Sequence, residues 1–327
     1  MLPHSHFLDY GEGRDEAIGD KPRSHPVTVC IATYCIGPDY PVIVGASDRM
    51  LTSDLHKSET RLSKIHQLTP NIVVLIAGDV DTQGDICVRT HFAKPKTVRE
   101  AAEIYSAELA KHNRKQAERK ILAPIGFTMR SFFEKQSQLS PEFVDDVMRR
   151  IRDERANVNT IICGTDNEGS FAGTNSGAHI YAVDDFGRIS YKNSVGFAAI
   201  GDGAWHAQSQ LMFAKYDPLW PFTRALLLTY IAKKRAEITP GVGVDTDLFC
   251  ITPHGFLFVA PEVMTALEES YADIRQTQDF AMDEANKRSL KFSEAILASA
   301  QKGRASPKPP EPELTLQPQP KSRKKTP

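Results

Sequence analysis

The sequence predicts an α+β fold, a four-layer α/β/β/α sandwich in which two antiparallel sheets lie between two layers of helices. Short runs of β-branched and apolar residues alternate with pairs of helical segments, in the order strands, helix pair, strands, helix pair, strands. Turn-forming pairs such as Gly37-Pro38 and Pro70-Asn71 bound these runs, which is typical of strands that pair in antiparallel fashion. Apolar residues follow one another without alternation, so we expect these strands to be buried on both faces.

Composition narrows the class of protein. The chain has 327 residues, a net charge of −1 and 41% hydrophobic residues, which is typical of one large domain with tails. The near-neutral charge gives no reason to expect nucleic acid as a partner, and no apolar run reaches the roughly 18 residues of a membrane span. The N-terminal region lacks a basic segment followed by an apolar one, so we expect no secretory signal. The five cysteines fall mostly in apolar contexts, which predicts reduced core thiols and a cytoplasmic location.

The first group of strands is expected between residues 28 and 78. Three segments are β-branched apolar runs, and a fourth carries Lys64 ahead of an apolar stretch. The four segments cover 28–32, 42–49, 61–68 and 72–78. Gly78-Asp79 ends the last of them and marks the change to a helical pattern.

Helices are expected over most of residues 82–155. The first covers 82–91, and the second begins at Thr97, where Thr97-Val98-Arg99-Glu100 has the form of a capping box. Residues 121–140 have the composition of a loop. Ser140-Pro141 then predicts a further helix, with serine as the N-cap and proline at the first helical position.

The second half of the chain predicts more strands, two helices and a final helix. Strands are expected at 159–164, 179–183, 196–200, 245–251 and 256–259, with a hairpin turn at Asp184-Asp185-Phe186-Gly187. Helices are expected from Asp202 to Lys215, from Pro221 to Lys234 and over 262–300.

These elements divide the chain into three regions. Residues 1–27 are polar and predict a flexible lead or a propeptide. Residues 28–300 form one domain, with a helical insertion at about 95–155 and the C-terminal helix 262–300. Residues 301–327 are rich in proline and lysine and predict a disordered tail, because such a segment cannot pack a core.

The order of the pieces resembles proteasome-type β subunits, a family of N-terminal-nucleophile hydrolases. Ser47-Asp48-Arg49 stands where that family has Asp-Ser-Arg, Lys64-Ile65 stands where it has its lysine, and Ala77-Gly78-Asp79 opens the first helix. The stretch from Ile162 to Gly203 is similar to the family's later strands, its Asp-x-x-Gly turn and its Gly-Ser-Gly helix opener. The resemblance covers about 28–259, and it implies a proteasome-like four-layer sandwich for the domain.

The resemblance also implies the chemistry of a threonine peptidase. In such enzymes the hydroxyl of the first residue attacks a carbonyl, and the free α-amine of that residue takes the hydroxyl proton. An α-amine has a pKa of about 8, which suits this role. A neighbouring lysine stabilises the developing negative charge. The resemblance gives these roles to Thr28 and Lys64. Thr28 is internal in the sequence, so it must be released by cleavage after Val27.

The chain departs from the family pattern at several positions. His25-Pro26-Val27 stands where the family favours glycine, Ser47 replaces the aspartate beside the lysine, and Asp202 replaces the serine of Gly-Ser-Gly. The candidate catalytic set is therefore Thr28, Lys64, Asp202 and Ser47. We predict an ion pair between Lys64 and Asp202, because Asp202 would then supply the negative charge that Ser47 does not.

Each candidate residue also has a structural interpretation. Thr28 is a β-branched residue at a strand start, and an alternative alignment places Val27 or Pro26 at the first position instead. Lys64 can equally be a surface lysine or an ion-pair partner, Ser47 a packing residue and Asp202 a helix cap.

Several neighbouring polar residues have structural interpretations too. We expect Asp48 and Arg49 to form a structural ion pair, and Trp205 and His206 to be helix-packing residues. The position of Asp247 beside a strand suits either a site or a turn.

Two functions follow from the resemblance. The first is a threonine-type amide-bond hydrolase that acts on peptides or proteins, and the second is a non-catalytic ring-forming or scaffold relative with the same fold. Both imply self-association into a ring-like homo-oligomer, and neither requires a membrane, a metal or another cofactor. Only the enzyme needs Thr28 as a free N-terminus.

Overall fold

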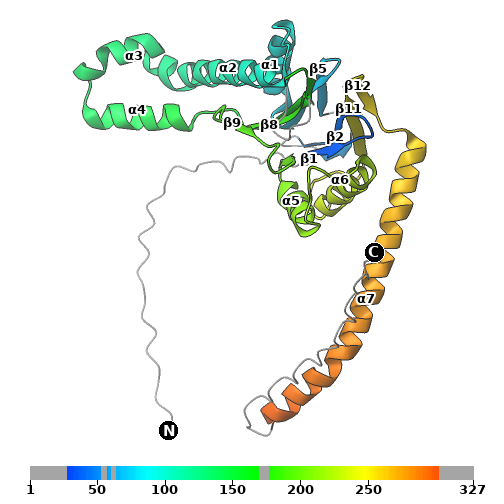
Figure 1. Cartoon of the computed structure of the whole chain (residues 1–327). Coiled ribbons are helices and arrows are strands. Elements are labelled where there is room, and N and C mark those ends of the chain that lie inside the picture. Colours follow the sequence, from blue (N-terminus) through cyan, green and yellow to red (C-terminus); the bar gives the residue numbers. More distant parts are fainter. Residues whose placement is uncertain (1–27, 53–56, 60–63, 169–176, 302–327) are drawn as a thin grey trace, which may run out of the picture. The chain divides into compact units, whose positions relative to one another are not determined.

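The computed structural model describes residues 28–52, 57–59, 64–168 and 177–301 (Figure 1). In this part of the chain the fold is α+β, with two five-stranded antiparallel sheets, a two-stranded ribbon and seven α-helices. The expectations for 1–27 and for the tail beyond residue 301 lie outside the described residues.

The first sheet has the strand order β10-β1-β2-β11-β12, and all its neighbouring strands are antiparallel. Its strands are β1 (Cys30–Ile36), β2 (Pro41–Asp48), β10 (Phe197–Ile200), β11 (Thr246–Thr252) and β12 (Gly255–Phe258). Every residue of β2 is buried, as its continuous apolar run predicts. Thr28 lies just ahead of β1 and not within it, which differs from the predicted strand.

The second sheet has the order β5-β6-β7-β8-β9 and is also antiparallel. Its strands are β5 (Ile65–Thr69), β6 (Ile72–Gly78), β7 (Val158–Asp166), β8 (Gly177–Val183) and β9 (Ile189–Tyr191). The predicted hairpin turn between β8 and β9 is confirmed, since the Gly187 amide donates to the Asp184 carbonyl at 2.9 Å and Gly187 has a φ of +80°. The small ribbon consists of β3 (Met50–Thr52) and β4 (Lys57–Glu59).

Two hydrophobic clusters hold these elements together. One cluster takes residues from both sheets, including Cys30 and Ile43 of the first and Leu75 and Ile161 of the second. The other joins β6, β7 and β8 to the helices α1 (Val80–Phe92) and α2 (Val98–Ala117). Burial of apolar surface at these two places is the main favourable term for folding.

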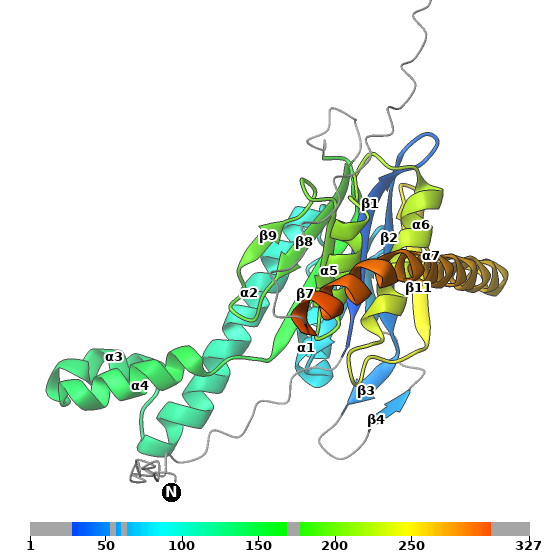
Figure 2. The same ribbon diagram turned by 90° about the horizontal axis from the view of Figure 1, so that it is seen from below.

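A helical extension follows α2. It contains a π-helical turn, η1 (Glu118–Leu122), then α3 (Met129–Lys135) and α4 (Pro141–Asp153), and in Figures 1 and 2 α3 and α4 lie side by side. Its own cluster includes Leu122, Phe132 and Val147. The expectation of a loop over 121–140 is therefore wrong, because these apolar side chains fold the segment by packing against α4.

The helix ends show which local predictions hold. Thr97 caps α2 through a hydrogen bond from the Glu100 amide at 3.1 Å, but the Glu100 carboxylate accepts from the Lys96 amide and not from that of Thr97. Ser140 caps α4 as predicted. The N-cap of α5 (Ala204–Phe213) is Gly203, so the interpretation of Asp202 as that cap is wrong.

Contacts divide the chain into two units, Met1–Met264 and Thr265–Pro327. The first unit contains both sheets and the helices up to α6 (Phe222–Ala236). Most of α7 (Pro261–Gln301) belongs to the second unit, and α7 confirms the helix expected at 262–300. Within the described ranges, no helix has the length and apolarity needed to cross a membrane.

Candidate active site

Thr28 lies at the centre of a buried polar network. Its hydroxyl donates to Oδ1 of Asp48 at 2.5 Å and accepts a hydrogen bond from Nζ of Lys64. Lys64 Nζ also contacts Asp48 Oδ1 at 2.8 Å, so hydroxyl, ammonium and carboxylate touch one another in pairs. The exposed fractions of Thr28, Asp48 and Lys64 are only 3%, 0% and 6%. In such surroundings a charge interacts more strongly with its neighbours than it would in water.

The local backbone explains why these three groups meet. Asp48 is the last residue of β2, and its amide donates to the Val29 carbonyl at 3.2 Å, which aligns the end of β2 with the residues ahead of β1. Lys64 comes just before β5, and its carbonyl accepts from the Ile76 amide at 3.1 Å. One residue of the network thus comes from the second sheet's side and two from the first.

The turn after β10 fixes the backbone of Thr28. The Gly203 amide donates to the Thr28 carbonyl at 3.1 Å. Gly201 has a φ of +87°, and a Cβ atom there would lie 2.3 Å from the Thr28 carbonyl oxygen. Glycine is therefore required at 201, both for its backbone conformation and for the close approach to Thr28.

Backbone amides complete the coordination of Asp48. Val29 donates to Oδ1 at 2.9 Å, and Gly243, in the loop between α6 and β11, donates to Oδ2 at 3.1 Å. Hydrogen bonds to both oxygens hold the carboxylate in one orientation and stabilise its negative charge.

The structure corrects the predicted partner of Lys64. Within the described residues its ion pair is with Asp48 and not with Asp202, which is exposed at the start of the α5 turn. Ser47 does not join the network either: it is fully buried, and its Oγ has no hydrogen-bond partner among the residues described. The sequence interpretation thus assigned the carboxylate partner of Lys64 to Asp202, whereas the partner is Asp48, the residue after Ser47 on β2.

The other expected contacts also change. Arg49 pairs with Asp247 at 2.5 Å, so Asp48 and Arg49 each have a partner that the sequence did not predict. Trp205 is 76% exposed and His206 is exposed too, so the expectation that they are helix-packing residues is wrong. Asp247 belongs to β11 and lies opposite Ser47, where it supports the strand pairing through Arg49.

Sequence reasoning missed Asp48 and Gly243 as parts of the site. A signal for Asp48 was present, because it is a charged residue at the end of a strand that is otherwise made of apolar and small residues. Gly243 acts through its backbone amide, and no side-chain pattern reports such a role.

The cysteines are not candidates for the nucleophile. All five are free and buried, which confirms the expected core thiols. Cys30 is close to the network, but burial raises the pKa of its thiol to about 12, with a smaller opposing effect from Lys64. A thiol with such a pKa is almost entirely protonated at neutral pH and is a weak nucleophile.

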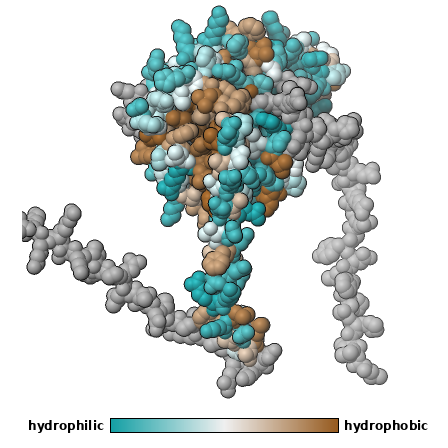
Figure 3. Space-filling view, turned by 90° about the vertical axis from the view of Figure 1, so that its right-hand side faces the viewer, coloured by the Kyte–Doolittle hydropathy of each residue, from teal (hydrophilic) through white to brown (hydrophobic). Residues whose placement is uncertain are grey.

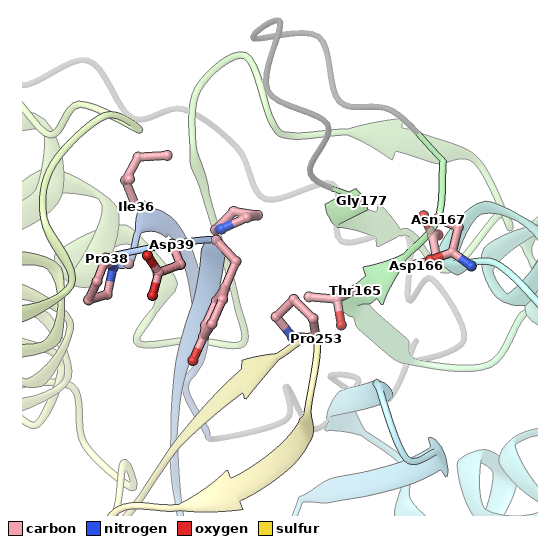
Figure 4. A pocket seen from close by; sticks show the side chains of 11 residues that line it. Ile36, Pro38, Asp39, Thr165, Asp166, Asn167, Gly177 and Pro253 are labelled. Atoms are coloured by element: carbon pink, nitrogen blue, oxygen red, sulfur yellow. The ribbon is translucent and has the colours of Figure 1, made fainter.

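A pocket of about 380 Å³ lies at the other end of β1 (Figure 4). The β1–β2 turn lines one side with Pro38 and Asp39, and Thr165, Asp166 and Pro253 line the other. Its lining includes neither Thr28 nor Lys64, so the pocket and the polar network are separate features of the first unit.

Among the described residues no cluster of three or more histidine, cysteine, aspartate or glutamate side chains is placed to hold a metal ion. The chain matches no known family profile, and no curated protein matches it.

Proposed function

We propose that the chain is a threonine-type amide-bond hydrolase of the N-terminal-nucleophile kind, with Thr28 as its nucleophile after cleavage following Val27. The observation that carries the proposal is the position of the Thr28 hydroxyl, which contacts both Lys64 Nζ and the Asp48 carboxylate. A hydroxyl between a cation and a carboxylate is the arrangement expected of an activated nucleophile.

Each residue would have a defined role. The Thr28 oxygen attacks the amide carbon, and its proton passes to the freed α-amine of the same residue. The amine then gives this proton to the leaving nitrogen, which produces an acyl ester on Thr28 and a free amine product. Water hydrolyses the ester, releases the acid and restores the hydroxyl. Lys64 stabilises negative charge on the Thr28 oxygen, and Asp48 keeps the ammonium of Lys64 in place.

The same proposal includes the four-layer α/β/β/α sandwich of the proteasome-like fold. Three contacts support this order of layers. The two sheets share one hydrophobic cluster, α1 and α2 pack with the second sheet, and α6 contacts β1 and β2 of the first.

Assembly into a ring-like homo-oligomer and action on peptides or proteins complete the proposal. Exposed apolar residues support self-association: on α5, Met212 is 68% exposed and Phe213 is 83% exposed. Apolar side chains also gather in patches between hydrophilic ones on the face drawn in Figure 3. Five free thiols are consistent with a cytoplasmic location, where cysteines stay reduced.

A second candidate function is a non-catalytic ring-forming or scaffold relative. The observation that favours it is the burial of Thr28, which is only 3% exposed. In that case Lys64 and Asp48 would form a structural ion pair, and the Thr28 hydroxyl would serve only as a hydrogen-bond partner of both side chains.

Intact mass and N-terminal sequencing of the purified full-length chain distinguish the two functions. We expect wild-type protein and the Thr28→Ser control to begin at residue 28, because both keep the hydroxyl. The Thr28→Ala variant should keep its full length. Wild-type protein that remains uncleaved and hydrolyses no fluorogenic peptide amide would rule out the enzyme.

A further inference from the structure

A second buried lysine lies behind the network. Lys233, on α6, is fully buried. Its Nζ donates to the Glu237 carboxylate at 2.7 Å and to the carbonyl oxygens of Gly243 at 2.9 Å and Val244 at 2.8 Å. An ammonium group has three donors, so these three acceptors satisfy it completely.

The loop that Lys233 binds is the one that binds Asp48. The Gly243 amide donates to Asp48 Oδ2 at 3.1 Å, while the carbonyl of the same residue accepts from Lys233. A single residue therefore connects the Lys233 ammonium to the carboxylate that holds Lys64 and Thr28. No other side chain is needed to make this connection.

The charges of Lys233 and Asp48 also act on each other. Burial lowers the pKa of Lys233, and the carboxylates of Glu237 and Asp48 oppose that shift. Keeping a fully buried lysine charged is costly unless it is paired and hydrogen-bonded. The Glu237 carboxylate and the carbonyl oxygens of Gly243 and Val244 supply these hydrogen bonds to Lys233.

We propose that Lys233 is a positioning residue for the Thr28 site, which it serves by fixing the Gly243 loop against Asp48. The proposal deepens the proposed hydrolase function and rests on it for its catalytic meaning. Without the ammonium, the carbonyls of Gly243 and Val244 lose their hydrogen bonds from Lys233, and only that of Val244 still accepts from the Thr246 hydroxyl, at 3.4 Å. The Gly243 amide is then no longer held at Asp48 Oδ2. Asp48 can then rotate, and Lys64 and the Thr28 hydroxyl lose their fixed geometry.

Lys233→Met removes the ammonium and keeps an apolar side chain in the core. Lys234→Met is the matched control, because Lys234 is the next residue on α6 and binds the other oxygen of Glu237 at 3.2 Å. Lys233→Met removes one of the two lysines that pair with Glu237, so Lys233→Met with Glu237→Gln is the second variant, in which that carboxylate is neutral. Thermal melting identifies which of these full-length variants are folded.

The first measurement does not depend on activity. Hydrogen exchange of the Gly243 amide should speed up at least about tenfold in the folded Lys233 variant, since its acceptor is no longer fixed, and should stay unchanged in Lys234→Met. Equal protection of Gly243 in both variants would overturn the proposal.

The second measurement uses fluorogenic peptide amides that the wild-type chain cleaves. We expect kcat to fall roughly tenfold to a hundredfold in the Lys233 variant with KM nearly unchanged, because misplacement of a reacting group affects the chemical step. A loss confined to KM, or an equal loss in Lys234→Met, would contradict the positioning role. If wild-type protein hydrolyses no substrate, the proposed hydrolase fails, and Gly243 exchange alone decides whether Lys233 positions Asp48.

Discussion

Asp48 and Asp166 both have buried carboxylates, and they lie near opposite ends of β1. Each accepts hydrogen bonds from two backbone amides, but their side-chain partners differ. Asp48 accepts from two backbone amides, Val29 and Gly243, and pairs with Lys64. Asp166 accepts from the amides of Val98 and Glu168, at 2.7 and 2.9 Å, and lies 3.3 Å from Nε2 of His179.

The comparison shows what makes the Asp48 end a candidate site. A buried carboxylate with backbone donors is a common structural device, because buried charges need hydrogen bonds. What sets Asp48 apart from Asp166 is the Thr28 hydroxyl, which contacts both members of the ion pair. Asp166 instead borders the pocket of Figure 4. The candidate catalytic residues and the pocket therefore lie at opposite ends of β1.

The largest expected effect comes from breaking the ion pair at the Asp48 end. Lys64→Met removes the cation that pairs with the buried Asp48 charge, which should cost about 3–5 kcal/mol of unfolding free energy. Lys64→Met combined with Asp48→Asn should recover much of this loss, because no charge is then stranded. Denaturant unfolding of the two single variants and the double variant measures the coupling. Losses that simply add would show that the two side chains do not interact in the folded protein.

A glycine pair tests whether the backbone of Thr28 is held as tightly as its side chain. Gly201→Ala should lose more stability than Gly126→Ala. Both glycines have a positive φ, which costs another residue about 1–2 kcal/mol, but only at Gly201 does the new Cβ meet the Thr28 carbonyl, since the space around Gly126 is open. Thermal unfolding of the two variants checks the order. Equal losses would mean that the turn moves freely away from Thr28.

At the opposite end of β1, Asp166 should make the free energy of unfolding depend on pH in the acid range. Burial alone would raise the pKa of Asp166, but hydrogen bonds from His179 and from the amides of Val98 and Glu168 outweigh it and lower the pKa. A lowered pKa in the folded state gives stability that is present above the unfolded carboxyl's pKa of 3.8 and is lost as pH falls through the folded value.

Asp166→Asn should therefore reduce stability at neutral pH and flatten the loss below about pH 4. Asp39→Asn is the control, because Asp39 lines the same pocket and is exposed. Urea unfolding at several pH values between neutral and acid gives both curves. An unchanged acid limb in Asp166→Asn would show that another group causes it.

The smallest effect should come from Ser47, the neighbour of Asp48 on β2. Its hydroxyl is buried without a hydrogen-bond partner among the described residues, so Ser47→Ala should leave stability within about 1 kcal/mol of wild type, or raise it. Processing at residue 28 should be unaffected. A strong loss of processing would restore Ser47 to the candidate site.

The sequence predicted those parts of the fold that have strong local signals. The bounds of β6 are the predicted ones, because Pro70-Asn71 and Gly78-Asp79 mark both of its ends. The N-cap of α4 was readable from Ser140 and Pro141. The segment around α3 was not, since its apolar residues gain their partners only when α4 packs against them.

The site was predictable in part for a related reason. Thr28 and Lys64 could be singled out from the order of strands, and the structure brings them together. Short motifs do not fix an alignment to the single residue, and a shift of one position in a strand exchanges its two faces. This is why Ser47 was chosen and Asp48 was not. Gly243 and its support by Lys233 depend on the fold of a loop, which no local pattern reports.

The separate hydrophobic cluster of the helical extension has a consequence for local unfolding of the protein. Leu122, Phe132 and Val147 pack with one another and not within the clusters of the sheets. A segment with its own small core can unfold as one cooperative unit, at a lower free energy than unfolding of the whole domain requires. The extension should thus act as a foldon of its own. Its amide hydrogens should exchange together and sooner than those of β6, β7 or β2, the strand that carries Asp48.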